Sequence, residues 1–67
     1  MYTFRAEKVR KLRMNHELTV YAFGKRVGNK PNYMVVGWEE GRITPSIPTL
    51  EKMCVEFGVE PNYFFTK

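Results

Sequence analysis

The apolar residues of the chain recur at spacings of three and four rather than at alternate positions, and this is the period of an α-helix. The clearest run lies near the carboxyl end, at positions i, i+3, i+4 and i+7: Leu50, Met53, Cys54 and Phe57. Ser46 can cap this helix and Gly58 can end it. No stretch alternates like a strand over a useful length, so the pattern predicts an all-α fold.

A second apolar run indicates a helix in the first half of the chain, with its inward residues at Val20, Phe23 and Val27. Thr19 is placed to cap this helix, because a threonine oxygen accepts from the free N–H groups of a first turn. Gly28 follows the run directly and can end the helix. The predicted helix therefore covers residues 20–27.

Pro31 marks the start of the third predicted helix, because proline fits the first turn of a helix and not its interior. We expect the helix to begin at Pro31 or one residue later and to end before Gly41. Trp38 should point into the core together with one earlier residue. Counting forward from the turn assigns that place to Met34, whereas counting back from Trp38 assigns it to Val35, and Pro31 favours the second count.

The two ends of the chain carry shorter patterns. Thr3 can cap a first helix over about residues 4–15, with Val9 and Leu12 on its inward side. After the fourth helix, a proline can open a short last helix over residues 61–65. Five short helices in all are expected.

The length of 67 residues predicts one domain over residues 1–67. So small a core should take in nearly every large apolar side chain. No apolar run is long enough for a membrane span, and no secretion signal is present, so we expect a cytoplasmic protein without a membrane partner. One histidine (His16), one cysteine (Cys54) and no aspartate leave no metal site, cofactor or enzyme constellation to expect.

The positive charge is concentrated in the first part of the chain. Residues 1–42 carry nine lysines and arginines against four glutamates, whereas residues 43–67 carry two against three. The whole chain has a formal net charge of +4 and a sequence pI of about 9.5. A basic front end favours a polyanionic partner. The alternative is a solvated face with spare lysines.

Several short motifs occur in a characteristic order along the chain: Val9-Arg10-Lys11-Leu12-Arg13, Leu18-Thr19, Gly28, Trp38-Glu39-Glu40-Gly41, Pro45-Ser46, Leu50, Phe57-Gly58-Val59 and Phe64-Phe65. In this order they resemble the Cro/repressor-type, or Xre-like, helix-turn-helix domains of phages, plasmids and bacteria. The resemblance covers about residues 5–65. It implies a compact, five-helix, lambda-repressor-like fold that binds double-stranded DNA sequence-specifically, usually as a dimer on a two-fold site.

The chain departs from the pattern of that family at four places. Val20 stands where a glutamine often touches phosphate, and Gly24 stands where alanine is usual. The turn between Gly28 and Trp38 is one residue longer than in the family. Glu40 stands where an asparagine often faces phosphate. Val20, Glu40 and the uncharged run Val35-Val36-Gly37 also suit a surface that binds protein.

The resemblance and side-chain chemistry together place the expected DNA contacts on the third helix, its preceding turn and the loop after it: Lys30, Asn32, Tyr33, Val36, Gly37, Arg42, Thr44 and Ser46. Lysine can contact guanine, asparagine can pair with adenine, and valine can touch a thymine methyl group. An arginine beside a helix N-terminus is suited to phosphate. The alternatives are a polar turn, a partly packed helix and a solvated loop arginine.

Two further groups of residues have expected roles: one stabilises the fold, and the other forms the contact between two copies of the protein. By resemblance, Arg13 and Glu39 form a partly buried salt bridge that ties the first helix to the end of the third. Tyr63, Phe64 and Phe65 are consecutive on a short helix and cannot all face one interior, so at least one should be exposed. This end is the expected interface of a weak homodimer.

Two functions follow from these observations. The first is a transcription regulator that occupies a pseudo-palindromic operator in double-stranded DNA. The second is a modulator or antitoxin-like protein on the same fold, which binds a regulator protein and binds DNA weakly or not at all.

Overall fold

The computed structural model describes residues 3–66, which form four α-helices, one 3-10 turn and a two-stranded sheet. In chain order the elements are β1 (Thr3–Phe4), α1 (Ala6–Asn15), α2 (Val20–Arg26), α3 (Asn32–Glu40), α4 (Ile47–Phe57), η1 (Pro61–Phe64) and β2 (Phe65–Thr66). The predicted fifth helix is only the single turn η1, so the count of five helices is not exact. No helix in this part of the chain is long and apolar enough to cross a membrane.

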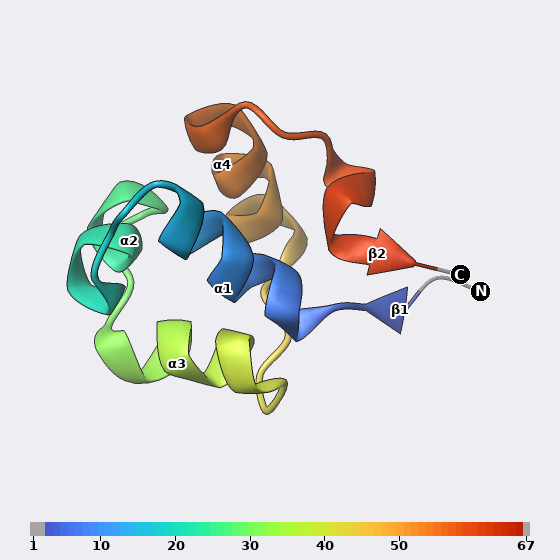
Figure 1. Cartoon of the computed structure of the whole chain (residues 1–67). Helices are drawn as coiled ribbons and strands as arrows, with labels where there is room; N and C mark the ends of the chain where they lie inside the picture. Colours follow the sequence, from blue (N-terminus) through green and yellow to red (C-terminus); the bar gives the residue numbers. More distant parts are fainter. Residues whose placement is uncertain (1–2, 67) are drawn as a thin grey trace.

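Helix α1 lies in the centre of the molecule, with α2 on one side, α3 below it and α4 above and partly behind it (Figure 1). The main helix contacts join α1 to α3 and α2 to α3. Strands β1 and β2 lie together at the far end of α1 from α2, so the two ends of the chain are close to each other (Figure 1). This arrangement leaves the outer side of α3 without a covering element.

The predicted caps of α2 and α4 are confirmed. The side-chain oxygen of Thr19 accepts from the N–H of Ala22 at 3.1 Å. Ser46 Oγ accepts from the N–H of Thr49 at 3.4 Å, and α4 ends at Gly58. The local sequence therefore fixes both boundaries of α4 and the start of α2, because each cap satisfies an N–H group that the helix leaves open.

The predicted start of the first helix is wrong. Thr3 does not cap a helix; Thr3 and Phe4 form β1, which pairs antiparallel with β2 and places Phe4 opposite Phe65. Helix α1 begins at Ala6, with Arg5 as an extended N-cap residue. The N–H of Arg5 donates to the carbonyl of Phe64 at 2.8 Å. The far end of the chain thus supplies partners that the local pattern could not reveal.

The core collects apolar residues from every helix and from η1: Val9, Leu12, Phe23, Val27, Val35, Trp38, Leu50, Met53, Phe57 and Phe64. The rings of Phe23 and Phe57 stack with centroids 5.2 Å apart and planes at 5°. Val35 is fully buried and Met34 only partly, which confirms the register counted back from Trp38. The buried face of α3 is thereby fixed, and with it the face that remains outside.

Several apolar residues lie outside this core, contrary to expectation. Five large ones are exposed: Met14, Tyr21, Tyr33, Ile47 and Val55. Cys54 is only partly buried. The physical reason is geometric, because each of the four short helices offers inward positions on one face only. The exposed residues fall on the other faces.

Candidate nucleic-acid interface

A nearly buried ion pair fixes α3 on α1. Arg13 Nε lies 2.6 Å from Glu39 Oε2, and Arg13 Nη2 lies 3.1 Å from Glu39 Oε1. The remaining nitrogen, Nη1, donates to the carbonyl of Leu18 at 2.9 Å. The two side chains are only 16% and 9% exposed. This confirms the predicted pair, and the hydrogen bond to Glu39 raises the pKa of Arg13, so the guanidinium stays charged.

The turn between α2 and α3 folds back over α2. The N–H of Lys30 donates to the carbonyl of Gly24 at 2.8 Å. A Cβ atom on Gly24 would overlap the carbonyl oxygen of Lys30 and would lie 3.2 Å from Val35 Cγ2. Glycine is therefore needed at position 24, because the turn places the backbone of Lys30 directly against α2.

Three of the predicted DNA-contacting residues lie on the outer side of α3. Asn32 is exposed, and Tyr33 retains 67% of its accessible surface. Val36 is partly exposed one turn further along the same helix. Lys30 lies partly exposed just before the helix begins. These four predicted positions thus share the start and outer side of α3.

Gly37 does not belong to this outer side, so its predicted exposure is wrong. It is buried, and a Cβ atom there would lie 2.5 Å from Ile43 Cδ1. Its carbonyl accepts from the N–H groups of Arg42 and Ile43 at 2.9 and 3.1 Å. The absence of a side chain lets the loop after α3 close against the helix.

That loop carries the other predicted contacts. Arg42 Nε lies 2.8 Å from Glu40 Oε1, and both side chains are largely exposed. The charge of Arg42 is thus partly balanced inside the protein. Thr44 is exposed, whereas the hydroxyl of the exposed Ser46 is engaged with Thr49 as the cap of α4.

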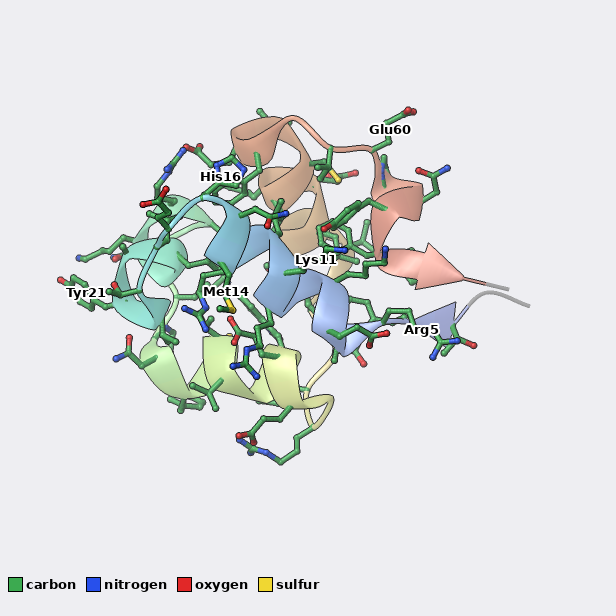
Figure 2. The ribbon with its side chains drawn as sticks, in the orientation of Figure 1. Arg5, Lys11, Met14, His16, Tyr21 and Glu60 are labelled. Atoms are coloured by element: carbon green, nitrogen blue, oxygen red, sulfur yellow. The ribbon has the colours of Figure 1, made fainter. Side chains whose placement is uncertain are left out.

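Residues on α2 and in the turn, which the sequence analysis did not select, lie beside the predicted contacts. A shallow hollow beside the start of α3 is lined by Tyr21, Lys25, Asn29, Lys30, Pro31 and Asn32. Tyr21 projects outward from α2, on the opposite side of the molecule from the strands (Figure 2). The Nζ atom of Lys25 lies 5.5 Å from the centre of its ring. The i, i+4 spacing of Tyr21 and Lys25 was the available signal.

The three aromatic residues at the carboxyl end do not behave alike. Phe64 is fully buried, so it cannot form part of an interface. Tyr63 and Phe65 are partly buried: Lys8 Nζ lies 5.0 Å from the ring centre of Tyr63, and the ring of Phe65 packs edge-on against Phe4. The expectation that at least one of the three is exposed is met only in part, by the partly exposed Tyr63 and Phe65. The β1–β2 pairing packs the ring of Phe65 against Phe4 and so covers part of Phe65.

Known proteins with a similar sequence pattern or a similar structure share the helix-turn-helix fold of this chain. Residues 9–64 match the sequence profile of the family described as Helix-turn-helix. The P22 c2 repressor, solved in complex with synthetic operator 9T, has a similar structure, with a TM-score of 0.82 and 24% identity over 92% of each chain. The restriction-modification controller protein C.AhdI from Aeromonas hydrophila is also similar, with a TM-score of 0.78 and 23% identity over 90% of this chain and 89% of that one.

A sequence comparison with curated proteins found no significant match. The match to the family profile nevertheless begins at Val9 in α1 and continues to the end of η1, so it includes all of α2, α3 and α4. The chain therefore belongs to the helix-turn-helix family, of the Cro/repressor (Xre-like) type of DNA-binding transcription regulators.

Proposed function

We propose that this protein regulates transcription by occupying an operator in double-stranded DNA, with α3 in the major groove. The proposal rests on how α3 is held against the rest of the protein. The Arg13–Glu39 pair and the buried Val35 and Trp38 hold one side of the helix, while Asn32 and Tyr33 project from the other. A short helix held rigidly with polar residues outward suits the major groove.

The residues that recognise the DNA sequence lie at the start and on the outer side of α3. Asn32 can donate to and accept from adenine in the bidentate manner, and Lys30 can donate to guanine. Val36 offers an apolar contact for a thymine methyl group, and Tyr33 adds a large exposed ring beside it. The face carries little charge, so DNA shape contributes to specificity as well.

The loop after α3 contacts the phosphate backbone of the DNA. Arg42 and Thr44 are exposed there, next to the first turn of α4 and the Ser46 cap. Free N–H groups at a helix start attract phosphate. Glu40 opposes this attraction, because it holds Arg42 in an exposed pair.

The operator is expected to be two-fold and the protein to bind it as a weak homodimer. One domain of this size makes few phosphate contacts, so a single copy binds weakly at physiological salt. Two copies on half-sites about 34–36 Å apart add their contacts. The operator-bound repressor of similar fold supports the choice of double-stranded DNA.

Binding to a regulator protein is the second candidate function. Exposed Tyr33 and the glutamate at position 40 favour it, because an exposed aromatic residue suits a protein interface and a glutamate repels phosphate. A modulator or antitoxin-like protein of this kind would bind DNA weakly. The two candidates differ in whether α3 discriminates between DNA sequences.

Fluorescence anisotropy with DNA from either side of the protein's own gene, and with random DNA, tests the proposal. Asn32→Ala should cost about 1–3 kcal/mol on the cognate site and little on random DNA. Arg42→Ala should weaken binding to both alike and lower the slope of log K against log salt by about 1. Equal losses on both DNAs for Asn32→Ala would remove this residue from the reading face. A parent protein that discriminates no DNA sequence would favour the protein-binding function.

A further inference from the structure

A strip of three lysines crosses the turn between α2 and α3 and reaches α4. Lys25 and Lys30 line the hollow beside the start of α3. Lys30 also lines a second, smaller hollow on the other side of the turn, together with Val27, Gly28, Pro48, Thr49 and Lys52. Because Lys30 belongs to both hollows, Lys25, Lys30 and Lys52 form one continuous surface. We refer to these three residues as the lysine strip.

The side chains of the strip converge at the turn. From the point where a Cβ of Gly28 would stand, Lys30 Cε is 3.7 Å away, and Cδ and Cε of Lys52 are each 4.0 Å away. Two ammonium groups on such neighbouring stems repel each other, and an anion placed between them removes the repulsion. At the other end of the strip, Tyr21 lies beneath the Lys25 ammonium and limits its positions.

The strip differs from three arginines of the molecule because, in the described part of the chain, none of its lysines is in salt-bridge contact with a carboxylate. Three described arginines have a glutamate in salt-bridge contact: Arg13 with Glu39, Arg26 with Glu56, and Arg42 with Glu40. Within residues 3–66, no such contact involves Lys25, Lys30 or Lys52. The three ammonium groups are thus open to an outside anion, although Glu51 and Glu56 line a further hollow with Lys52. Arg42, in contrast, is already in contact with Glu40.

We propose that the lysine strip binds successive phosphates of one DNA strand beside the groove that α3 enters. This inference rests on the proposed function. The strip adjoins the reading face directly, because Lys30 and Asn32 line the same hollow. The DNA backbone is then held at the start of α3 by lysines, and less firmly at the end of α3, where Glu40 offsets Arg42.

Such a site contributes affinity without sequence preference. Each phosphate that a lysine neutralises releases counterions and contributes about −0.9 to the slope of log K against log salt. Three lysines on three phosphates therefore contribute about −2.7. The contribution is the same on cognate and random DNA, since phosphates carry no sequence information.

The test measures this slope for Lys25→Gln, Lys30→Gln, Lys52→Gln and the triple variant, on cognate and random DNA. Lys11→Gln is the matched control: it removes the same charge from the exposed face of α1, away from the turn (Figure 2). Circular dichroism checks that each variant is folded. Lys52→Arg serves as a conservative variant that keeps the charge.

We expect each single lysine variant to reduce the steepness of the slope by about 1 and the triple variant by about 3, equally on both DNAs. Lys11→Gln should leave the slope unchanged, and Lys52→Arg should retain it. If the triple variant matches Lys11→Gln while the parent binds its operator, the strip is overturned and the proposed function stands. A loss confined to cognate DNA overturns it too, because that result marks base contacts. A parent without salt-dependent DNA binding overturns both proposals.

Discussion

Arg13 supports three elements with one side chain. Its guanidinium binds both carboxylate oxygens of Glu39 at the end of α3 and the carbonyl of Leu18 just before α2. The planar group suits this arrangement because its nitrogens donate in fixed directions, which a lysine ammonium does not do. The position of the candidate reading helix thus depends on a residue in α1 that has no proposed contact with DNA.

Removal of this side chain should cost stability. Arg13→Ala leaves Glu39 nearly buried and without its cation, so the free energy of unfolding should fall by about 3 kcal/mol. For a domain of this size, that loss lowers the melting temperature by roughly 12–24 °C. Thermal melts by circular dichroism measure it.

Two variants serve as comparisons for that measurement. Arg13→Met with Glu39→Leu should cost less than Arg13→Ala, because no buried charge is left alone. Arg42→Ala breaks the exposed pair with Glu40 and should have little effect on the melt. If Arg13→Ala stays within about 0.5 kcal/mol of the parent, as an ordinary surface change does, the pair does not hold α3 in place.

At the scale of elements, the turn before α3 determines which residues point outward. Its additional residue is accommodated because Lys30 folds back onto Gly24, and α3 then begins after Pro31 with Val35 inward. A register shifted by one residue would bury Met34 and rotate the reading face by about 100°, since a helix has 3.6 residues per turn. The glycine in α2 and the register of α3 therefore belong to one structural feature.

The variant Gly24→Ala distinguishes the contribution of helix propensity to stability from the contribution of packing against the turn. Propensity alone predicts that alanine stabilises α2 by roughly 1 kcal/mol. The carbonyl of Lys30 occupies the space that the new methyl group needs, so we expect a net loss of about 1–2 kcal/mol in a chemical denaturation experiment. Removal of Asn29 in the Gly24→Ala background should recover part of this loss, because it returns the turn to the usual family length. A Gly24→Ala variant more stable than the parent would show that the turn moves aside freely.

At the scale of the whole molecule, the two ends of the chain meet beside α1. The β1–β2 pair joins Thr3 to Thr66 and Phe4 to Phe65 across the whole length of the chain, and it brings the rings of Phe4 and Phe65 into contact. Phe64 faces the core, which leaves Tyr63 and Phe65 as the aromatic residues of this end with part of their surface outside. We propose these two residues as the contact between two copies on an operator.

Phe65→Glu tests that contact. It should abolish cooperative binding to the operator, because a carboxylate in an apolar contact is left without a partner. Binding curves measure the steepness and midpoint, and circular dichroism checks that the fold is kept. Tyr63→Glu is the second variant, since Tyr63 lies outside the strand pair. If both variants are folded and bind with unchanged steepness and midpoint, the carboxyl end does not join the copies.

The sequence by itself determined the features that depend on neighbouring residues. The caps Thr19 and Ser46, the stop at Gly58 and the inward face of α4 followed from local chemistry and helical period. The Arg13–Glu39 pair followed from family resemblance. Counting back from Trp38 also gave the correct buried residue of α3, because Pro31 restricts where a helix can start.

The tertiary structure alone decided the features that depend on contacts between distant residues. Thr3 became part of a strand because its partner lies at the other end of the chain, and Gly37 became buried because Ile43 folds onto it. Lys52 joined the strip because α4 packs beside the turn, although it is 22 positions from Lys30. Local patterns carry information about capping and period, whereas these contacts depend on how the elements pack.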